Sequence, residues 1–322
     1  MAAESPFIRE AKKYEPKIRK ALIKAFNELR TQESRAAIEK ALMEGGLDAV
    51  MRMFDNIQPK ISATLGPVLD EAILAGSNLP LEMIPAAALA ADVAVSLYNR
   101  YMVDFLERYK LNLIQTISNN TREAIRNQLI ADSVAGRNPR ETARTFRNSI
   151  GLTPTQEQSV RNYRSYLENL DRAALERKLR DRRSDSVIER AIRTQKPLSP
   201  EQIDKMTNRY RERYIKYRAE VIARTESMRA VSVGNRAAID VLINEGQVDT
   251  DSVRRFWVYV KDNRTREPHT KVPSMNPNGV KLDEPYKTPL GPLMFPRDPS
   301  GTAENTVQCR CVEKYKLINE EG

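Results

Sequence analysis

The residues best suited to hold a metal ion or to act as a nucleophile lie near the C-terminal end of the chain. His269 is the only histidine among the 322 residues, and Cys309 and Cys311 are the only two cysteines. Zinc favours imidazole nitrogen and thiolate sulfur as donors, so these three residues are candidate metal ligands. Asp262, a little before the histidine, could add a carboxylate oxygen to the same site.

Three interpretations of these residues stay open. Residues two apart on a strand have Cα atoms about 6.6–6.8 Å from each other, so Cys309 and Cys311 would share one metal ion only if the chain bends. Catalysis by a Cys–His pair would need a third group that orients the imidazole, and Asp262 or Glu226 could serve. The simplest interpretation is two small thiols buried in a core. We therefore expect neither an enzyme nor a resident cofactor, with zinc bound by His269, Cys309 and Cys311 as the alternative.

The sequence before and between these residues predicts a long helix followed by a small mixed domain. Apolar residues recur at spacings of three and four over 203–242, with Ser199 as the expected helix cap and Gly246 as the expected end. The alternating segment 256–260 predicts a strand. Segment 307–312 predicts a second strand with both cysteines on one face, and eight prolines lie in the loop between the two strands.

The earlier part of the chain has the periodicity of helices. An apolar stripe covers 7–29, and the glycine pair 45–46 should end the next helix. Prolines between 59 and 85 predict a loop-rich stretch with short helices. A long helix is expected over 86–117, and Thr121 has the character of the cap that starts another. Several short helices joined by turns should follow up to the long helix.

These elements predict a mainly α fold with a small C-terminal α+β domain, in which an elongated helical body has one long helix leading into the cap. We expect three regions: N-terminal helices over 1–119 that could dock on another protein, an arginine-rich helical region over 120–246, and the cap over 247–322 with its proline-rich loop. No run of about eighteen uncharged apolar residues occurs, which excludes a plain transmembrane protein. Residues 1–17 lack a basic-then-apolar signal pattern, so we expect synthesis in a cytoplasm.

Positive charge is concentrated in one block of the sequence. The chain has 53 basic and 43 acidic residues, a net charge of +10, and residues 121–240 alone have 26 basic and 16 acidic residues. Arginine outnumbers lysine there by 22 to 4, and guanidinium groups suit phosphates and carboxylates through paired hydrogen bonds. A solvated helical face laced with ion pairs is the alternative. The candidate DNA-binding residues are Arg172, Arg177, Lys178, Arg180, Arg182, Arg183, Arg209, Arg211 and Arg213.

The segment 222–227, IARTES, lies within the predicted long helix. Arg224 and Glu226 are two residues apart and point in different directions, so each should meet a different partner. The loop 262–269, DNRTREPH, offers an acid for Arg224 and an arginine for Glu226. We therefore expect a polar clasp that locks the cap to the helix, with two ordinary surface charges as the alternative. The clasp residues are Arg224, Thr225, Glu226, Asp262, Thr265, Arg266 and His269.

The order of these pieces resembles the phage Mu F-like family of minor head proteins over about residues 120–315. The matching features are IARTES with Ala230 and Gly234 downstream, then Trp257, DNRTREPH, a proline-rich loop, and the closing CRC at 309–311. The resemblance implies a low-copy virion protein that associates with the portal vertex, assists head morphogenesis and, in some phages, influences DNA ejection. The family's residues carry no assured catalytic role.

This resemblance, together with the charge pattern, predicts where the protein acts and what it contacts. We expect a minor capsid protein inside the head near the portal, made in the host cytoplasm during assembly. Its expected partners are the portal protein, a major capsid or scaffold surface, packaged DNA bound without sequence preference, and other copies of itself. The alternative is a DNA ejection protein that acts at the host envelope, supported by the alanine-rich segment 72–99, where only Glu82 and Asp92 are charged.

Overall fold

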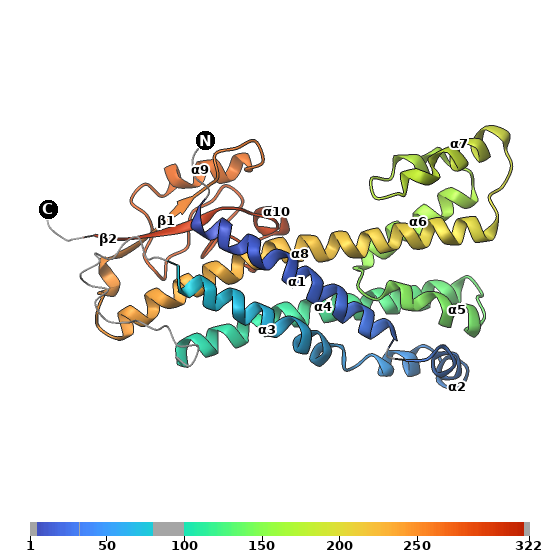
Figure 1. The fold of residues 1–322 in the computed structure, drawn as a ribbon, viewed down its shortest axis with the longest axis horizontal. Coiled ribbons are helices and arrows are strands. Elements are labelled where there is room, and N and C mark those ends of the chain that lie inside the picture. Colours follow the sequence, from blue (N-terminus) through green and yellow to red (C-terminus); the bar gives the residue numbers. More distant parts are fainter. Residues whose placement is uncertain (1–4, 32, 80–99, 319–322) are drawn as a thin grey trace. The chain divides into compact units, whose positions relative to one another are not determined.

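The computed structural model describes residues 5–31, 33–79 and 100–318. The fold is mainly helical with a small C-terminal α+β part, which confirms the predicted fold class (Figure 1). The helices and strands are α1 (Pro6–Thr31), α2 (Arg35–Met53), α3 (Ile57–Ser77), α4 (Arg100–Val134), α5 (Pro139–Thr145), α6 (Pro154–Glu168), α7 (Asp185–Thr194), α8 (Pro200–Asn244), β1 (Val253–Val258), α9 (Glu267–Met275), α10 (Ala303–Thr306) and β2 (Val312–Leu317).

The chain divides into two compact units, each built from separated segments. Unit 1 comprises residues 1–20, 66–109 and 221–322, and unit 2 comprises residues 21–65 and 110–220. Each unit is described by itself below. The three consecutive regions expected from the sequence concern function as well as packing, and they stay a prediction.

The core of unit 1 is the second half of α8. Residues 225–235 are buried without interruption, so this part of the helix is covered on all sides. α3 packs on it through small residues: a Cβ added to Gly234 would lie 1.9 Å from the carbonyl oxygen of Ile73, and one added to Gly76 would lie 2.1 Å from that of Val231. Glycine at these two positions therefore lets the two backbones touch.

The cap lies within unit 1 and contains a two-stranded sheet. β1 and β2 pair antiparallel, from Val253 opposite Leu317 to Val258 opposite Val312 (Figure 1). Alternate residues of β1 are buried, as a strand with one covered face requires. Trp257 packs there in a cluster with both cysteines and with apolar residues of α9 and the proline-rich loop. The sheet thus places Trp257 beside the candidate metal ligands.

In unit 2, polar caps fix where the helices begin. Thr153 and Gln156 form a reciprocal capping box at the start of α6. Ser199 Oγ accepts a hydrogen bond from the Gln202 backbone, while the Gln202 side chain accepts one from Ser199 N–H, which confirms the predicted cap of α8. Tyr163 of α6 stacks on Tyr210 of α8 with ring centroids 4.3 Å apart. These contacts position the arginine-rich segment between α6 and α8.

Two expected features of the cap and of α4 are wrong. Residues 307–311 form no strand: Gln308 has a φ of 56°, which breaks an extended chain, and β2 begins at Val312. Thr121 caps no helix, because it is fully buried within α4 and its hydroxyl donates to the Ile117 carbonyl. The apolar face of α4 continues through this point and overrides the local cap signal.

The expected loop-rich stretch after residue 59 is also wrong for the described part. α3 is one helix that contains Pro67, and its stripe Ile61, Leu65, Leu69 and Ile73 is fully buried. Burial of this stripe offsets the hydrogen bond that proline removes. By contrast, Gly46, with a φ of 61°, interrupts α2 near the predicted helix end, although helical residues continue beyond the kink to Met53. Gly246 ends α8 as expected, with a φ of 71°.

Some expectations concern residues outside the described ranges. The start of the helix expected over 86–117 and most of the alanine-rich segment 72–99 fall on residues 80–99, which the structure does not describe. Among the described helices, none combines the length and the apolar character needed to span a bilayer.

Candidate functional site

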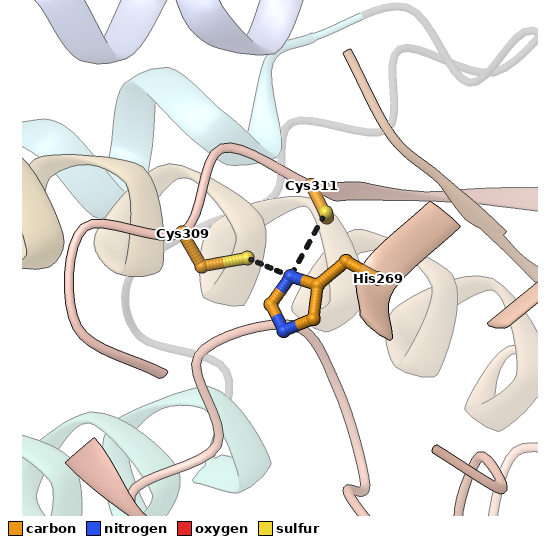
Figure 2. A group of neighbouring side chains, drawn as sticks. All are labelled: His269, Cys309 and Cys311. Atoms are coloured by element: carbon orange, nitrogen blue, oxygen red, sulfur yellow. Dashed lines mark hydrogen bonds between the residues drawn. The ribbon is translucent and has the colours of Figure 1, made fainter. Parts of the chain in front are cut away.

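His269, Cys309 and Cys311 meet in the interior of the cap. His269 comes from the first turn of α9, and the cysteines come from the segment between α10 and β2. Each of the three residues is at most 2% exposed. Both cysteine sulfurs lie 3.5 Å from the same atom, Nδ1 of His269, and Figure 2 shows them approaching it from two directions. The structure thus brings together all three candidate ligands proposed from the sequence.

The opposite edge of the imidazole is held by an amide. His269 Nε2 lies 2.9 Å from Asn305 Oδ1, and the Asn305 amide nitrogen donates to the hydroxyl of Thr288 at 3.2 Å. Since the amide oxygen can only accept, Nε2 carries the proton and the lone pair of Nδ1 points at the two sulfurs. Trp257 meets the imidazole edge-on, with ring centroids 5.5 Å apart. These contacts fix both the tautomer and the orientation of His269.

The electrostatics favour one thiolate in this group. A hydrogen bond with Cys311 lowers the pKa of Cys309 well below that of an ordinary thiol, against the effect of burial, and His269 and Arg297 lower it further. The same hydrogen bond, together with burial, raises the pKa of Cys311. Burial lowers the pKa of His269, but its hydrogen bonds with Cys309 and Asn305 outweigh this and leave it raised. The proton is therefore held unequally by the two sulfurs.

The segment that carries the cysteines is shaped by a buried arginine. Arg297 is fully buried, and its guanidinium donates to the backbone carbonyls of both Cys309 and Cys311. A second contact fixes the turn before them, where the backbone N–H of Gln308 donates to Thr225 Oγ1 at 3.0 Å. Carbonyls held in this way are not in a strand ladder, so both cysteine side chains can face His269. The sequence analysis missed Arg297, because a lone arginine in a proline-rich loop gives no periodic signal.

The expected pairs of the polar clasp are replaced by others. Arg224 lies 3.4 Å from Glu15 of α1, and Glu226 forms a buried ion pair of 2.7 Å with Arg229 on its own helix. Asp262 is bound by both terminal nitrogens of Arg310. The pairing of Arg224 with the acid of the loop and of Glu226 with its arginine is therefore corrected. Arg224 has a partner on α1, Glu226 has one on its own helix, and Asp262 has one within the cap.

The remaining clasp residues do connect parts of the cap. Arg266 donates to the Val307 carbonyl, and the Thr265 hydroxyl donates to the Val260 carbonyl. Together with the hydrogen bond between Thr225 and Gln308, the Arg266 contact holds the segment before the cysteines on two sides. Neither Glu226 nor Asp262 orients the imidazole, a role that Asn305 has instead. The expectation that the protein is not an enzyme stays a prediction.

The candidate DNA-binding residues lie in unit 2 and differ in exposure. Arg172, Lys178, Arg182 and Arg183 are exposed, and the other five are partly buried. Asp181, only 3% exposed, is shared by Arg183 at 2.8 Å, Arg209 at 3.1 Å and Arg213 at 3.3 Å. These four residues are called the Asp181 cluster below. One carboxylate among three guanidinium groups leaves an excess of positive charge on this part of the unit.

Arg211 is a weaker candidate for contact with DNA. Its side chain is 11% exposed and lies 3.9 Å from the fully buried Glu157. It also lines a cavity of about 420 Å³ that contains Asp132, Glu168 and Asp204 as well as further arginines. The three acids offset part of the charge of the arginines around this cavity, and the low exposure of Arg211 keeps its guanidinium from a phosphate backbone.

Neutralising Asp181 should destabilise unit 2 in a pH-dependent way. A hydrogen bond from Arg183 lowers the pKa of Asp181 to about 2, below the ordinary value of about 3.9. The stabilising contribution is therefore complete above pH ~4 and lost between pH ~4 and ~2. We expect Asp181→Asn to lower the melting temperature at pH 7 by roughly 2–4 °C and to match the unsubstituted protein near pH 2.

The matched control is Glu189→Gln, an exposed acid of α7, which should leave the melting temperature nearly unchanged at every pH. Thermal unfolding followed by circular dichroism across this pH range measures both variants. Parallel curves for Asp181→Asn and the unsubstituted protein, with a constant gap down to pH 2, would contradict the charge-based explanation.

The comparisons with known proteins match the chain to one family. No curated protein and no solved structure matches the chain. A family model described as Phage Mu protein F like protein matches residues 123–313, more than half of the chain. The match contains α8, the Asp181 cluster and all three of His269, Cys309 and Cys311. The chain therefore belongs to the Phage Mu protein F like family of phage head morphogenesis proteins, as the resemblance predicted.

Proposed function

We propose that the protein is a minor head protein at the portal vertex, where it assists head assembly and contacts packaged DNA through the arginine-rich part of unit 2. Family membership supports the role in the head. The observation that carries the DNA contact is the Asp181 cluster, in which three guanidinium groups surround one carboxylate. The excess charge is available to phosphates because the side chain of Arg183 is 75% exposed.

The chemistry of this surface fits a phosphate backbone better than a set of bases. Guanidinium groups bind phosphates through paired hydrogen bonds, and contacts to phosphates alone give binding without sequence preference. Asp181 holds Arg183, Arg209 and Arg213 in place, so the arginines lose less conformational freedom when they bind. Arg172, Lys178 and Arg182 add exposed positive charge from the same stretch of chain.

An acidic protein surface is the other partner that such charge could meet. A portal or capsid surface rich in carboxylates would also pair with arginine forks. Competition separates the two: a surface that binds phosphates in general should be displaced by excess duplex of any sequence. We take DNA as the partner because the whole excess charge of the sequence falls within the arginine-rich block.

Removing exposed charge from Arg183 of the Asp181 cluster and from two residues near it should weaken DNA binding and its dependence on salt. The triple variant Lys178→Gln, Arg182→Gln, Arg183→Gln removes three candidate phosphate contacts. Each contact to duplex DNA contributes about 0.9 to the slope of log affinity against log salt. We therefore expect the slope to fall by roughly 2–3, measured by fluorescence anisotropy with a duplex of arbitrary sequence at several salt concentrations.

The matched control removes the same charge from α1, with Lys12→Gln, Lys13→Gln and Lys20→Gln, three exposed lysines of unit 1. The control should change the slope of log affinity against log salt by less than about 0.9, the contribution of one phosphate contact. Equal losses in both variants would show that only the net charge matters, and the absence of binding at low salt would remove the DNA contact. Locating the chain in intact particles by cross-linking tests the portal position separately.

A second role, as an ejection protein acting at the host envelope, rests on the segment 72–99 alone, and most of that segment lies outside the described residues. Vesicle leakage separates this role from a purely structural one. Release of dye by the purified protein at low concentration would favour ejection, and intact vesicles would favour the role at the portal.

A further inference from the structure

We propose that His269, Cys309 and Cys311 bind one zinc ion, through Nδ1 of the histidine and both cysteine sulfurs, and that this ion fastens α9 to the segment before β2. This inference goes beyond the role in the phage head, because it concerns how the cap is held together. It rests on the positions of the donors, on the contacts that orient them and on the architecture of the cap.

The two sulfur–nitrogen distances match those of a tetrahedral zinc site. Zinc lies about 2.3 Å from cysteine sulfur and about 2.0–2.1 Å from histidine nitrogen, so a tetrahedral angle places sulfur and nitrogen about 3.6 Å apart. Both Sγ–Nδ1 distances are 3.5 Å, and all three donor atoms lie within 4.8 Å of one another. Both sulfur–nitrogen distances are therefore the ones that one shared ion requires.

A hydrogen bond accounts for only part of this arrangement. Nδ1 has a single lone pair, which can accept one proton, yet two sulfurs lie at the same distance from it. An ion between the three donors would satisfy all of them at once. Figure 2 shows the two sulfurs on either side of Nδ1, with their bonds directed toward it.

The residues that contact the three donor side chains are arranged as in known types of metal site. A histidine that ligates a metal usually donates its other N–H to a carboxylate, carbonyl or water, which fixes the ring. Asn305, fully buried, has this position at Nε2 and is itself held by Thr288. The obstacle expected from the sequence, two cysteines held apart on a strand, does not arise, because Arg297 binds their carbonyls and no ladder forms there.

The cap has little regular secondary structure to stabilise it. Its sheet has two strands of six residues each. In the described chain between α9 and α10, the β-type pairing is limited to two isolated bridges, Arg255 with Val280 and Tyr286 with Leu293. Small units with little regular structure are commonly stabilised by a metal ion or disulfides. Among the described residues, His269, Cys309 and Cys311 form the one group of three possible metal ligands that lie close together. Because this group supplies three donors, a water molecule is the expected fourth ligand.

Metal analysis of the full-length protein tests the proposal. We expect one zinc per chain after refolding with zinc, and cobalt substitution should give the intense near-ultraviolet absorption of thiolate-to-cobalt charge transfer. The double variant Cys309→Ser, Cys311→Ser should lose both signals. Asn305→Ala keeps all three donors, so it should still bind zinc, with an affinity lower by roughly 10–100-fold.

The cobalt signal is read on the unsubstituted protein, so the test holds even if the cysteine variant fails to fold. Folded protein that binds neither zinc nor cobalt would overturn the proposal, and so would a Cys309–Cys311 disulfide found by mass spectrometry in protein purified with zinc. Neither result bears on DNA binding, which is measured on unit 2 residues.

Discussion

Replacing Gly234 with valine should unfold unit 1. A Cβ at this position would lie 1.9 Å from the Ile73 carbonyl oxygen and 2.8 Å from the Ser77 backbone nitrogen. These atoms belong to the backbone of α3, so no side chain can rotate to make room. Relief requires the two helices to separate, which would open the packed cluster that includes Ile73, Val233 and Ala238. We expect a loss of more than about 4 kcal/mol, at the upper end for one substitution.

The control is Gly66→Ala, in the same helix α3, where an added Cβ meets no atom within 4 Å other than those of its chain neighbours and of the adjacent helix backbone. Alanine is favoured over glycine within a helix by about 1 kcal/mol, but Pro67 disfavours the helical conformation of a preceding residue that has a Cβ. This variant should therefore stay close in stability to the unsubstituted protein. Chemical denaturation followed by the fluorescence of Trp257, the single tryptophan, reports on unit 1. A folded Gly234→Val variant with ordinary stability would show that α3 and α8 are not in backbone contact.

The second large effect is expected for Arg255→Ala in β1. Arg255 is 1% exposed and lies 3.0 Å from the carboxylate of Glu313, which is 6% exposed. Its guanidinium also donates to three backbone carbonyls of the proline-rich loop, those of Lys281, Glu284 and Met294. Removing it leaves a buried carboxylate and three carbonyls without this donor, and breaking a buried ion pair costs about 3–5 kcal/mol.

The neighbouring Arg254→Ala is the matched control. Arg254 lies on the other face of the same strand, and its described hydrogen bonds go to nearby backbone carbonyls, so its loss should cost less than about 0.5 kcal/mol. Combining Arg255→Ala with Glu313→Gln should recover part of the loss, because the uncompensated charge is then absent. Equal effects of Arg254→Ala and Arg255→Ala on denaturation midpoints would contradict this role for Arg255.

The sequence was informative where local rules decide the structure. Ser199, Gly46 and Gly246 act as the cap, break and helix end that their types predict, because each effect depends on a few adjacent residues. Thr121 and Pro67 mark the limit of such rules. Both lie inside helices whose buried stripes continue past them, and tertiary packing outweighs one unfavourable residue.

The candidate metal site was predicted as a set of residues but not as a geometry. His269, Cys309 and Cys311 stand out because they are the only residues of their types. Their convergence depends on Arg297 and Gln308, which act through the backbone and leave no pattern in the sequence. Charge pairing was harder still: with so many arginines available, sequence alone could not show that Glu226 pairs with Arg229.

The division of unit 1 into separated segments affects how the chain must be synthesised. Ile8 and Ala11 of α1 pack against Met228 and Val231 of α8 and against Val312 in one apolar cluster, so this face of α1 is completely buried only once the ribosome has made β2. Unit 2, which needs no residue beyond 220, can form earlier. For most of translation the nascent chain therefore exposes an apolar helix, and a product truncated before β2 would keep part of it exposed and be prone to aggregate.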